Sequence, residues 1–142
     1  MITYKKIKTA VNRKLKETFG LEINSKDISE GFKRPSFFIE FDEVKRDGSV
    51  SQVEKSMIIR IYYFPKTIKE SSIEILEIQE QLGDVFDMKL IVEDRQLNIT
   101  EPNFNVTDGV LQFEFDIAFE DGRIVSEEYE LMEELDIDIQ KG

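Results

Sequence analysis

Pairs of carboxylates are the side chains in this sequence that are best suited to chemistry. Glu40 and Asp42 form one pair, and Glu114 and Asp116 form another, with Asp108 a few residues before it. Residues two apart in a strand point to the same face, so each pair brings two carboxylates close enough to bind Mg²⁺ or to transfer a proton. However, 30 of the 142 residues are Asp or Glu, so such pairs are expected from composition alone. We interpret them as an exposed polar sheet face and predict no metal site and no catalytic residues.

The residue types that are missing exclude most other chemistry. The chain contains no His and no Cys. Ser-His-Asp and Cys-His catalysis are therefore impossible, as are disulfides, iron–sulfur clusters and the usual zinc and haem sites. The seven glycines are scattered singly, so no Gly-rich phosphate loop exists. We predict that the protein is not an enzyme and binds no cofactor.

Two further motifs are too incomplete to indicate action on nucleic acid. Asp87-Met88-Lys89 resembles half of a metal-dependent nuclease site, but the upstream Pro-Asp partner is absent. Tyr62, Tyr63 and Phe64 are aromatic residues of the kind that stack on bases, but the dense basic surroundings that nucleic acid requires are missing. We predict no sequence-specific binding of nucleic acid.

Charge is distributed unevenly along the chain, whose formal net charge is −11. Residues 1–20 hold six bases and one acid, whereas residues 120–142 hold nine acids and two bases. This polarity indicates head-to-tail contacts between copies, or different partners at the two ends. Two solvated helix faces of opposite sign are the alternative interpretation.

Length and hydropathy indicate one domain without a membrane span. A chain of 142 residues is typical of a single domain, which we place at residues 1–122, followed by an acidic extension at residues 123–142. The most apolar stretch, Ile58–Phe64, is far shorter than the roughly 20 residues that cross a bilayer and contains an arginine. The first residues lack the apolar core of a signal peptide, so we expect a soluble protein made and kept in a cytoplasm.

A basic amphipathic helix is predicted near the N-terminus. Its apolar stripe consists of Tyr4, Ile7, Val11, Leu15 and Phe19. Thr3 is the expected N-cap and Gly20 the expected end. The basic residues Lys5, Lys6 and Arg13 lie mostly on the other side. Such helices bind membranes or nucleic acid in some proteins, but the wide stripe and the acidic chain favour a helix packed on the core.

A β-hairpin is predicted in the middle of the chain. Apolar and polar residues alternate after Pro35, which indicates a strand with one buried face. The polar segment Lys45–Ser49 contains an Asp-Gly pair and is the expected turn. A second strand is expected to follow and to end at Pro65, so the hairpin would have a charged tip.

One more helix and three further strands complete the predicted fold. The helix is expected to begin at Ser71, with Glu74 completing a capping box. Strands are expected at Met88–Val92, Leu97–Ile99 and Leu111–Phe119. The predicted class is α+β, with a mostly antiparallel sheet of about four to six strands packed against two main helices.

The C-terminal segment is predicted to be a short acidic helix beginning at Ser126. Its apolar residues are Tyr129, Met132 and Leu135. This segment is too short and too charged to form a core of its own, so we expect it to dock on a neighbour.

Several stretches resemble the phage tail terminator family found in phages and prophages of Gram-positive hosts. They occur in the family's order and together span residues 5–119. The similar segments are Ile7–Phe19, Gly31–Ile39, Ile61–Pro65, Asp94–Ile99 and Asp108–Asp116.

The resemblance implies a structural protein of the virion rather than an enzyme. Members of this family form a hexameric ring on the finished tail tube, stop its polymerisation and provide the surface to which the neck proteins of the head attach. In contractile tails the ring also meets the sheath. A negatively charged lumen would let DNA pass without binding. Candidate assembly contacts are the hairpin residues Lys45, Arg46 and Asp47, the helix residues Lys5, Lys6 and Arg13, and the C-terminal residues Tyr129, Met132 and Leu135.

Other classes of protein remain alternatives at this point. The protein would then be another neck or tail-completion protein, an acidic inhibitor that mimics DNA, or a carboxylate-metal enzyme. The second alternative rests on net charge alone, and the third would require tight Mg²⁺ or Mn²⁺ binding at Glu114 and Asp116.

Overall fold

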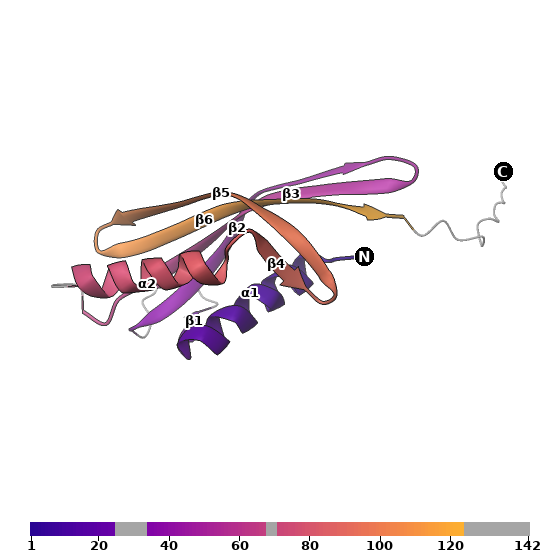
Figure 1. Cartoon of the computed structure of the whole chain (residues 1–142). Coiled ribbons are helices and arrows are strands. Elements are labelled where there is room, and N and C mark those ends of the chain that lie inside the picture. The colour runs from indigo at the N-terminus through magenta and orange to yellow at the C-terminus, as the bar shows by residue number, and fades with distance from the viewer. Residues whose placement is uncertain (25–33, 68–70, 124–142) are drawn as a thin grey trace. The chain divides into compact units, whose positions relative to one another are not determined.

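The computed structural model describes residues 1–24, 34–67 and 71–123. Their helices and strands, in chain order, are α1 Tyr4–Phe19, β1 Glu22–Asn24, β2 Ser36–Gly48, β3 Gln52–Phe64, α2 Ser72–Val85, β4 Lys89–Val92, β5 Arg95–Thr107 and β6 Val110–Gly122. The strands form one sheet in the order β1-β2-β3-β6-β5-β4 (Figure 1). β1 pairs with β2 in parallel, whereas β5 pairs antiparallel with β4 and with β6. The predicted α+β class is confirmed: the sheet has six strands, within the expected four to six, and there are two main helices among the described residues.

These elements divide into two compact units. The larger unit consists of Ile2–Lys45 and Ser56–Phe119, so it contains both helices and both edge strands. The described part of the smaller unit consists of Met1, Arg46–Lys55 and residues 120–123, and it contains the turn between β2 and β3. The predicted boundary at residue 122 is a different division of the chain and stays a prediction.

The core of the larger unit lies between one face of the sheet and the helices. Helix α1 buries Ile7, Val11 and Leu15, which are the centre of its predicted apolar stripe. Because α1 contacts both β1 and β4, which are the two edge strands, the sheet has to curl around this helix. Burying each of these side chains stabilises the fold by about 1.5–3 kcal/mol. The prediction that the basic helix packs on the core is confirmed.

The ends of the two helices are stabilised differently. Thr3 Oγ1 accepts a hydrogen bond from the Lys6 amide at 3.2 Å, and Gly20 ends α1 in a left-handed conformation, as predicted. Helix α2 begins after Ser71, but the Ser71 side chain makes no capping hydrogen bond. The Glu74 carboxylate instead accepts hydrogen bonds from the buried Tyr63 hydroxyl and from a backbone amide at Lys66. The predicted capping box is therefore wrong, because Glu74 satisfies a buried hydroxyl.

The hairpin of β2 and β3 is confirmed, but its turn lies later in the chain than predicted. Strand β2 continues to Gly48, so the charged residues 45–47 belong to a strand and residues 49–51 form the turn. Within the smaller unit, the Ser49 amide donates to the Gln52 carbonyl at 2.8 Å, and Ser49 Oγ accepts from the Gln52 amide at 3.1 Å. A serine that closes its own turn in this way replaces the Asp-Gly turn expected from the sequence.

Strand β5 departs most from the prediction. The sequence indicated a short strand at Leu97–Ile99, whereas β5 runs from Arg95 to Thr107. Its pairing with β6 shifts after Thr100, where Glu101 has a positive φ of 55° and Pro102 follows. This bulge removes the proline, which has no N–H to donate, from the hydrogen-bond ladder. The strand therefore continues past a residue that normally ends one.

Candidate functional site

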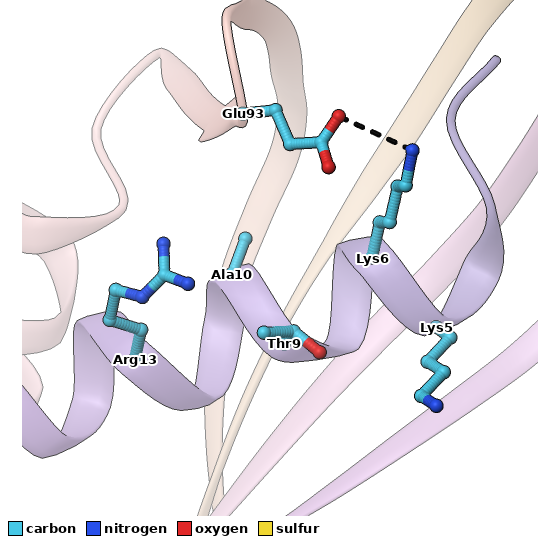
Figure 2. Close-up of a pocket in the computed structure, with 6 residues that line it drawn as sticks. All are labelled: Lys5, Lys6, Thr9, Ala10, Arg13 and Glu93. Atoms are coloured by element: carbon cyan, nitrogen blue, oxygen red, sulfur yellow. Dashed lines mark ion pairs between the residues drawn. The ribbon is translucent and has the colours of Figure 1, made fainter.

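A basic groove runs along the exposed side of α1 (Figure 2). It is lined by Lys5, Lys6, Thr9, Ala10, Arg13 and Glu93. Lys6 points toward Glu93, and their charged atoms lie 3.3 Å apart. Both side chains are about half exposed, so this ion pair contributes at most about 1 kcal/mol. The groove brings together the three basic residues of α1 that the sequence singled out, and its shortest lining residues leave room for an incoming side chain.

The predicted hairpin contacts lie at the end of β2. Lys45 belongs to the larger unit, whereas Arg46 and Asp47 belong to the smaller one, and all three side chains are exposed. In the smaller unit, Arg123 donates from Nε to the carbonyl of Ser49 at 2.7 Å. Its backbone amide also donates to a carbonyl of the same turn. Arg123 therefore fastens the end of β6 to the hairpin turn.

The predicted C-terminal contacts lie outside the described residues. They are Tyr129, Met132 and Leu135. Their proposed docking on a neighbour stays a prediction.

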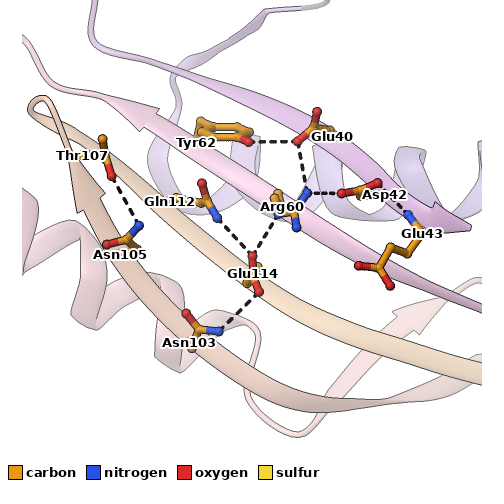
Figure 3. Close-up of polar contacts among 10 residues, drawn as sticks. All are labelled: Glu40, Asp42, Glu43, Arg60, Tyr62, Asn103, Asn105, Thr107, Gln112 and Glu114. Carbon is orange, nitrogen blue, oxygen red and sulfur yellow. Dashed lines mark hydrogen bonds and ion pairs between the residues drawn. The ribbon is translucent and has the colours of Figure 1, made fainter.

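A polar cluster centred on Arg60 lies on the sheet face opposite the helices (Figure 3). Arg60 Nε donates to Glu114 at 2.9 Å, and Arg60 Nη1 donates to Asp42 and lies 3.7 Å from Glu40. Because these residues come from β2, β3 and β6, one guanidinium joins three neighbouring strands. The hydrogen bond from Arg60, together with the backbone amide of Glu43, lowers the pKa of Asp42 below its usual value.

This cluster contains three of the carboxylates that the sequence offered as a metal site, namely the pair Glu40 and Asp42 and one member, Glu114, of the second pair. Glu40, Asp42 and Glu114 surround a cation that the chain supplies itself, and the Glu114 carboxylate also accepts from Gln112 at 3.0 Å. The sequence did not single out Arg60. The signal was present, since this arginine interrupts the otherwise apolar stretch Ile58–Phe64 and carboxylates occupy polar positions of the flanking strands.

Replacing Tyr62 with phenylalanine is expected to reduce the loss of stability in alkali. Burial, together with the hydrogen bond that its hydroxyl donates to Glu40 at 2.9 Å, raises the pKa of Tyr62 from 10.0 to about 12. The folded state therefore holds this proton more tightly than the unfolded state does. The resulting stabilisation is complete below about pH 10 and is lost as the pH rises toward about 12. Urea unfolding near pH 9 and near pH 11 measures the effect, and parallel losses in both proteins would contradict it.

The outer face of α2 is a second surface that the sequence analysis missed. Ile73 and Leu76 are 71% and 62% exposed, and they lie next to Glu77 and Glu80. Only the apolar stripe that contains Ile75 was recognised from the sequence. The two exposed aliphatic residues lie outside that stripe. Their position was the signal in the sequence that could have identified this surface.

Two kinds of feature are absent from the described residues. Neither helix among these residues is long and apolar enough to cross a membrane. The described residues also contain no group of three or more His, Cys, Asp or Glu side chains arranged to hold a metal ion. The distinctive surfaces of the described residues are a basic helix groove, an acidic helix face and a charged hairpin.

Comparison with protein families identifies the chain. The family model of the phage tail terminator protein matches residues 6–129. The chain belongs to this family, which confirms the resemblance inferred from the sequence. It is a structural component of a phage tail and interacts with other tail proteins. A comparison with curated proteins finds no significant match.

Proposed function

We propose that this protein caps the finished tail tube as a hexameric ring, stops tube polymerisation and offers the neck proteins of the head a surface for attachment. The observation that carries this proposal is the family match over residues 6–129. The separate basic and acidic helix faces support it, because a ring needs two different surfaces on every copy. Assembly would take place in the host cytoplasm.

The role proposed here requires no catalysis and no cofactor. Three of the five carboxylates that were the best candidates for chemistry, Glu40, Asp42 and Glu114, are engaged with Arg60, and this supports the proposal that the protein is not an enzyme. DNA would pass through the ring without sequence-specific contacts. The sheath of a contractile tail is a further proposed partner.

Polymerisation of purified tube protein tests the capping role directly. With the terminator present, we expect tubes that stop growing and carry additional density at one end in electron micrographs. Tube protein that grows to the same lengths with and without this chain would overturn the proposal. The control is heat-unfolded terminator at the same concentration.

Reversing the charges of Lys45 and Arg46 is expected to weaken docking on the tube. Both side chains are exposed on β2, so K45E with R46E should leave the monomer folded while removing two positive charges from the proposed tube contact. We expect about a tenfold loss of tube binding in a co-sedimentation assay. The matched control, K66E with K89E, changes the net charge equally at exposed positions elsewhere. Tube binding equal to that of the wild type would contradict this contact.

A further inference from the structure

Helix α2 presents an apolar and acidic face to solvent. Ile73, Leu76, Glu77 and Glu80 are spaced so that they lie side by side on the outside of the helix. The two aliphatic side chains are 71% and 62% exposed, although α2 buries Ile75 and Leu82 on its inner side. The segment SIEILEIQEQLGDV contains four acids and no base. An exposed aliphatic pair within one-signed charge is typical of a contact surface rather than of a solvated helix.

Helix α1 carries a surface of opposite charge, which is hollowed where its side chains are short. Its segment YKKIKTAVNRKLKETF contains six bases and one acid. The groove is bounded by Lys5 and Arg13, while Thr9 and Ala10 contribute only short side chains to it. Within the described residues, no ion pair involves Lys5, Arg13, Glu77 or Glu80. Among the residues that the structure describes, these four charges therefore have no ion-pair partner.

The two surfaces cannot satisfy each other within one copy, because both are exposed in the folded chain. A contact between them has to join two copies. Such a contact uses the α2 face of one copy and the α1 groove of the other, so a pair of copies keeps one unused surface of each kind. Repetition of the contact closes a ring when the rotation between neighbours allows it.

We infer that the outer face of α2, formed by Ile73, Leu76, Glu77 and Glu80, docks in the α1 groove of the next copy. This inference rests on the proposed ring and names its subunit contact. The aliphatic pair of one copy covers the short side chains of the groove, and the glutamates of α2 face Lys5 and Arg13. High salt should weaken the contact, because both charged sets lie at a surface.

Two charge-reversed proteins test this contact together. The first carries E77K and E80K and has two positive surfaces; the second carries K5E and R13E and has two negative surfaces. Each alone should lose capping of tail tubes by about tenfold, because like charges meet at every subunit contact. An equimolar mixture should recover capping, because copies that alternate around an even-numbered ring place opposite charges at every contact. The matched control, D87K with D94K, reverses two exposed acids elsewhere.

The outcomes of this experiment separate the inference from the proposed function. Single variants that cap like the wild type would overturn the inference. Variants that fail alone and are not recovered by mixing would also overturn it, because these surfaces would then contact the tube or another partner. In both cases capping by the wild type would still support the proposed ring. Failure of the wild type to cap would remove the ring and this contact together.

Cysteine cross-linking provides a second test that does not depend on charge. The chain has no native cysteine, so only the introduced thiols can form disulfides. A chain carrying both T9C and L76C should form covalent ladders between neighbouring copies when it is oxidised on tail tubes. A chain carrying T9C and V106C is the control, since Val106 is exposed on β5. Equal ladders in the two proteins, or none in the first, would overturn the inference.

Discussion

Replacing Phe115 with alanine is expected to lower the free energy of unfolding by about 3–5 kcal/mol. Phe115 is fully buried on β6, and its ring centroid lies 5.6 Å from that of Phe86 and 5.4 Å from that of Phe113. Alanine would leave a cavity where the end of α2 meets the sheet, and close-packed neighbours refill such cavities only in part. Because the chain has no Trp, urea unfolding is best followed by circular dichroism.

The control for this substitution lies on the same strand. Asp116 points to the polar face of β6, so Asp116→Ala should change the free energy of unfolding by only about 0.5 kcal/mol. Equal losses in the two variants would contradict the assignment of one face of β6 to the core.

Replacing Arg60 with methionine is expected to lower the free energy of unfolding by about 1–2 kcal/mol near neutral pH. Methionine keeps an apolar stem but removes the charge that three carboxylates share. The side chains of Glu40, Asp42 and Glu114 are 44%, 45% and 22% exposed. Water therefore screens part of their repulsion, and the effect is smaller than it would be in a closed core.

Acid should remove the difference between wild type and R60M. Arg60 keeps the pKa of Asp42 below its usual 3.8. A carboxyl with a lowered pKa stabilises the folded state above its unfolded pKa, and this stabilisation is lost as the pH falls through the folded pKa. The difference should be complete at neutral pH and should shrink at acid pH, as the pH falls below 3.8 and through the lowered pKa of Asp42. Urea unfolding at both pH values measures it, and a difference that persists in acid would show that Arg60 acts through packing. Lys89→Met, which removes a more exposed base, is the control.

Local signals in the sequence predicted the elements that depend on neighbouring residues. The N-cap Thr3 and the left-handed Gly20 delimit α1 as expected. The turn before β6 is another example, because Asp108 and Gly109 both have positive φ and join β5 to β6 as their residue types indicate. In these cases the same few residues determine both the pattern and the structure.

The predictions failed where a distant partner changes the role of a residue. Glu74 has the spacing of a capping residue, yet its carboxylate accepts a hydrogen bond from the hydroxyl of Tyr63 on β3. The end of β5 depends on β6, which continues pairing beyond the bulge next to Pro102. Arg60 acquires its importance only when β2 and β6 bring their carboxylates beside it. A single sequence does not specify which strands become neighbours, so the residue types were visible in the sequence but their partners were not.

The candidate site was predictable in part for the same reason. The basic residues of α1 share one helix face, and helical periodicity therefore placed Lys5 and Arg13 along one surface. The outer face of α2 was missed because Ile73 and Leu76 were counted neither as core nor as polar surface. Only the folded chain shows that these aliphatic side chains remain exposed.

The edges of the sheet affect whether a protein that is proposed to assemble with copies of itself would also form fibres. The edge strands β1 and β4 have three and four residues, against 13 in each of the other strands. In the part of the chain that the structure describes, β1 pairs only with residues 36–38 of β2. Farther along, β2 carries Glu43 with a positive φ, followed by the charged residues 45–47. Short edges, irregular backbone and charge all discourage strands of different copies from adding to one another. A protein that is proposed to end the growth of one polymer is thereby protected against starting another.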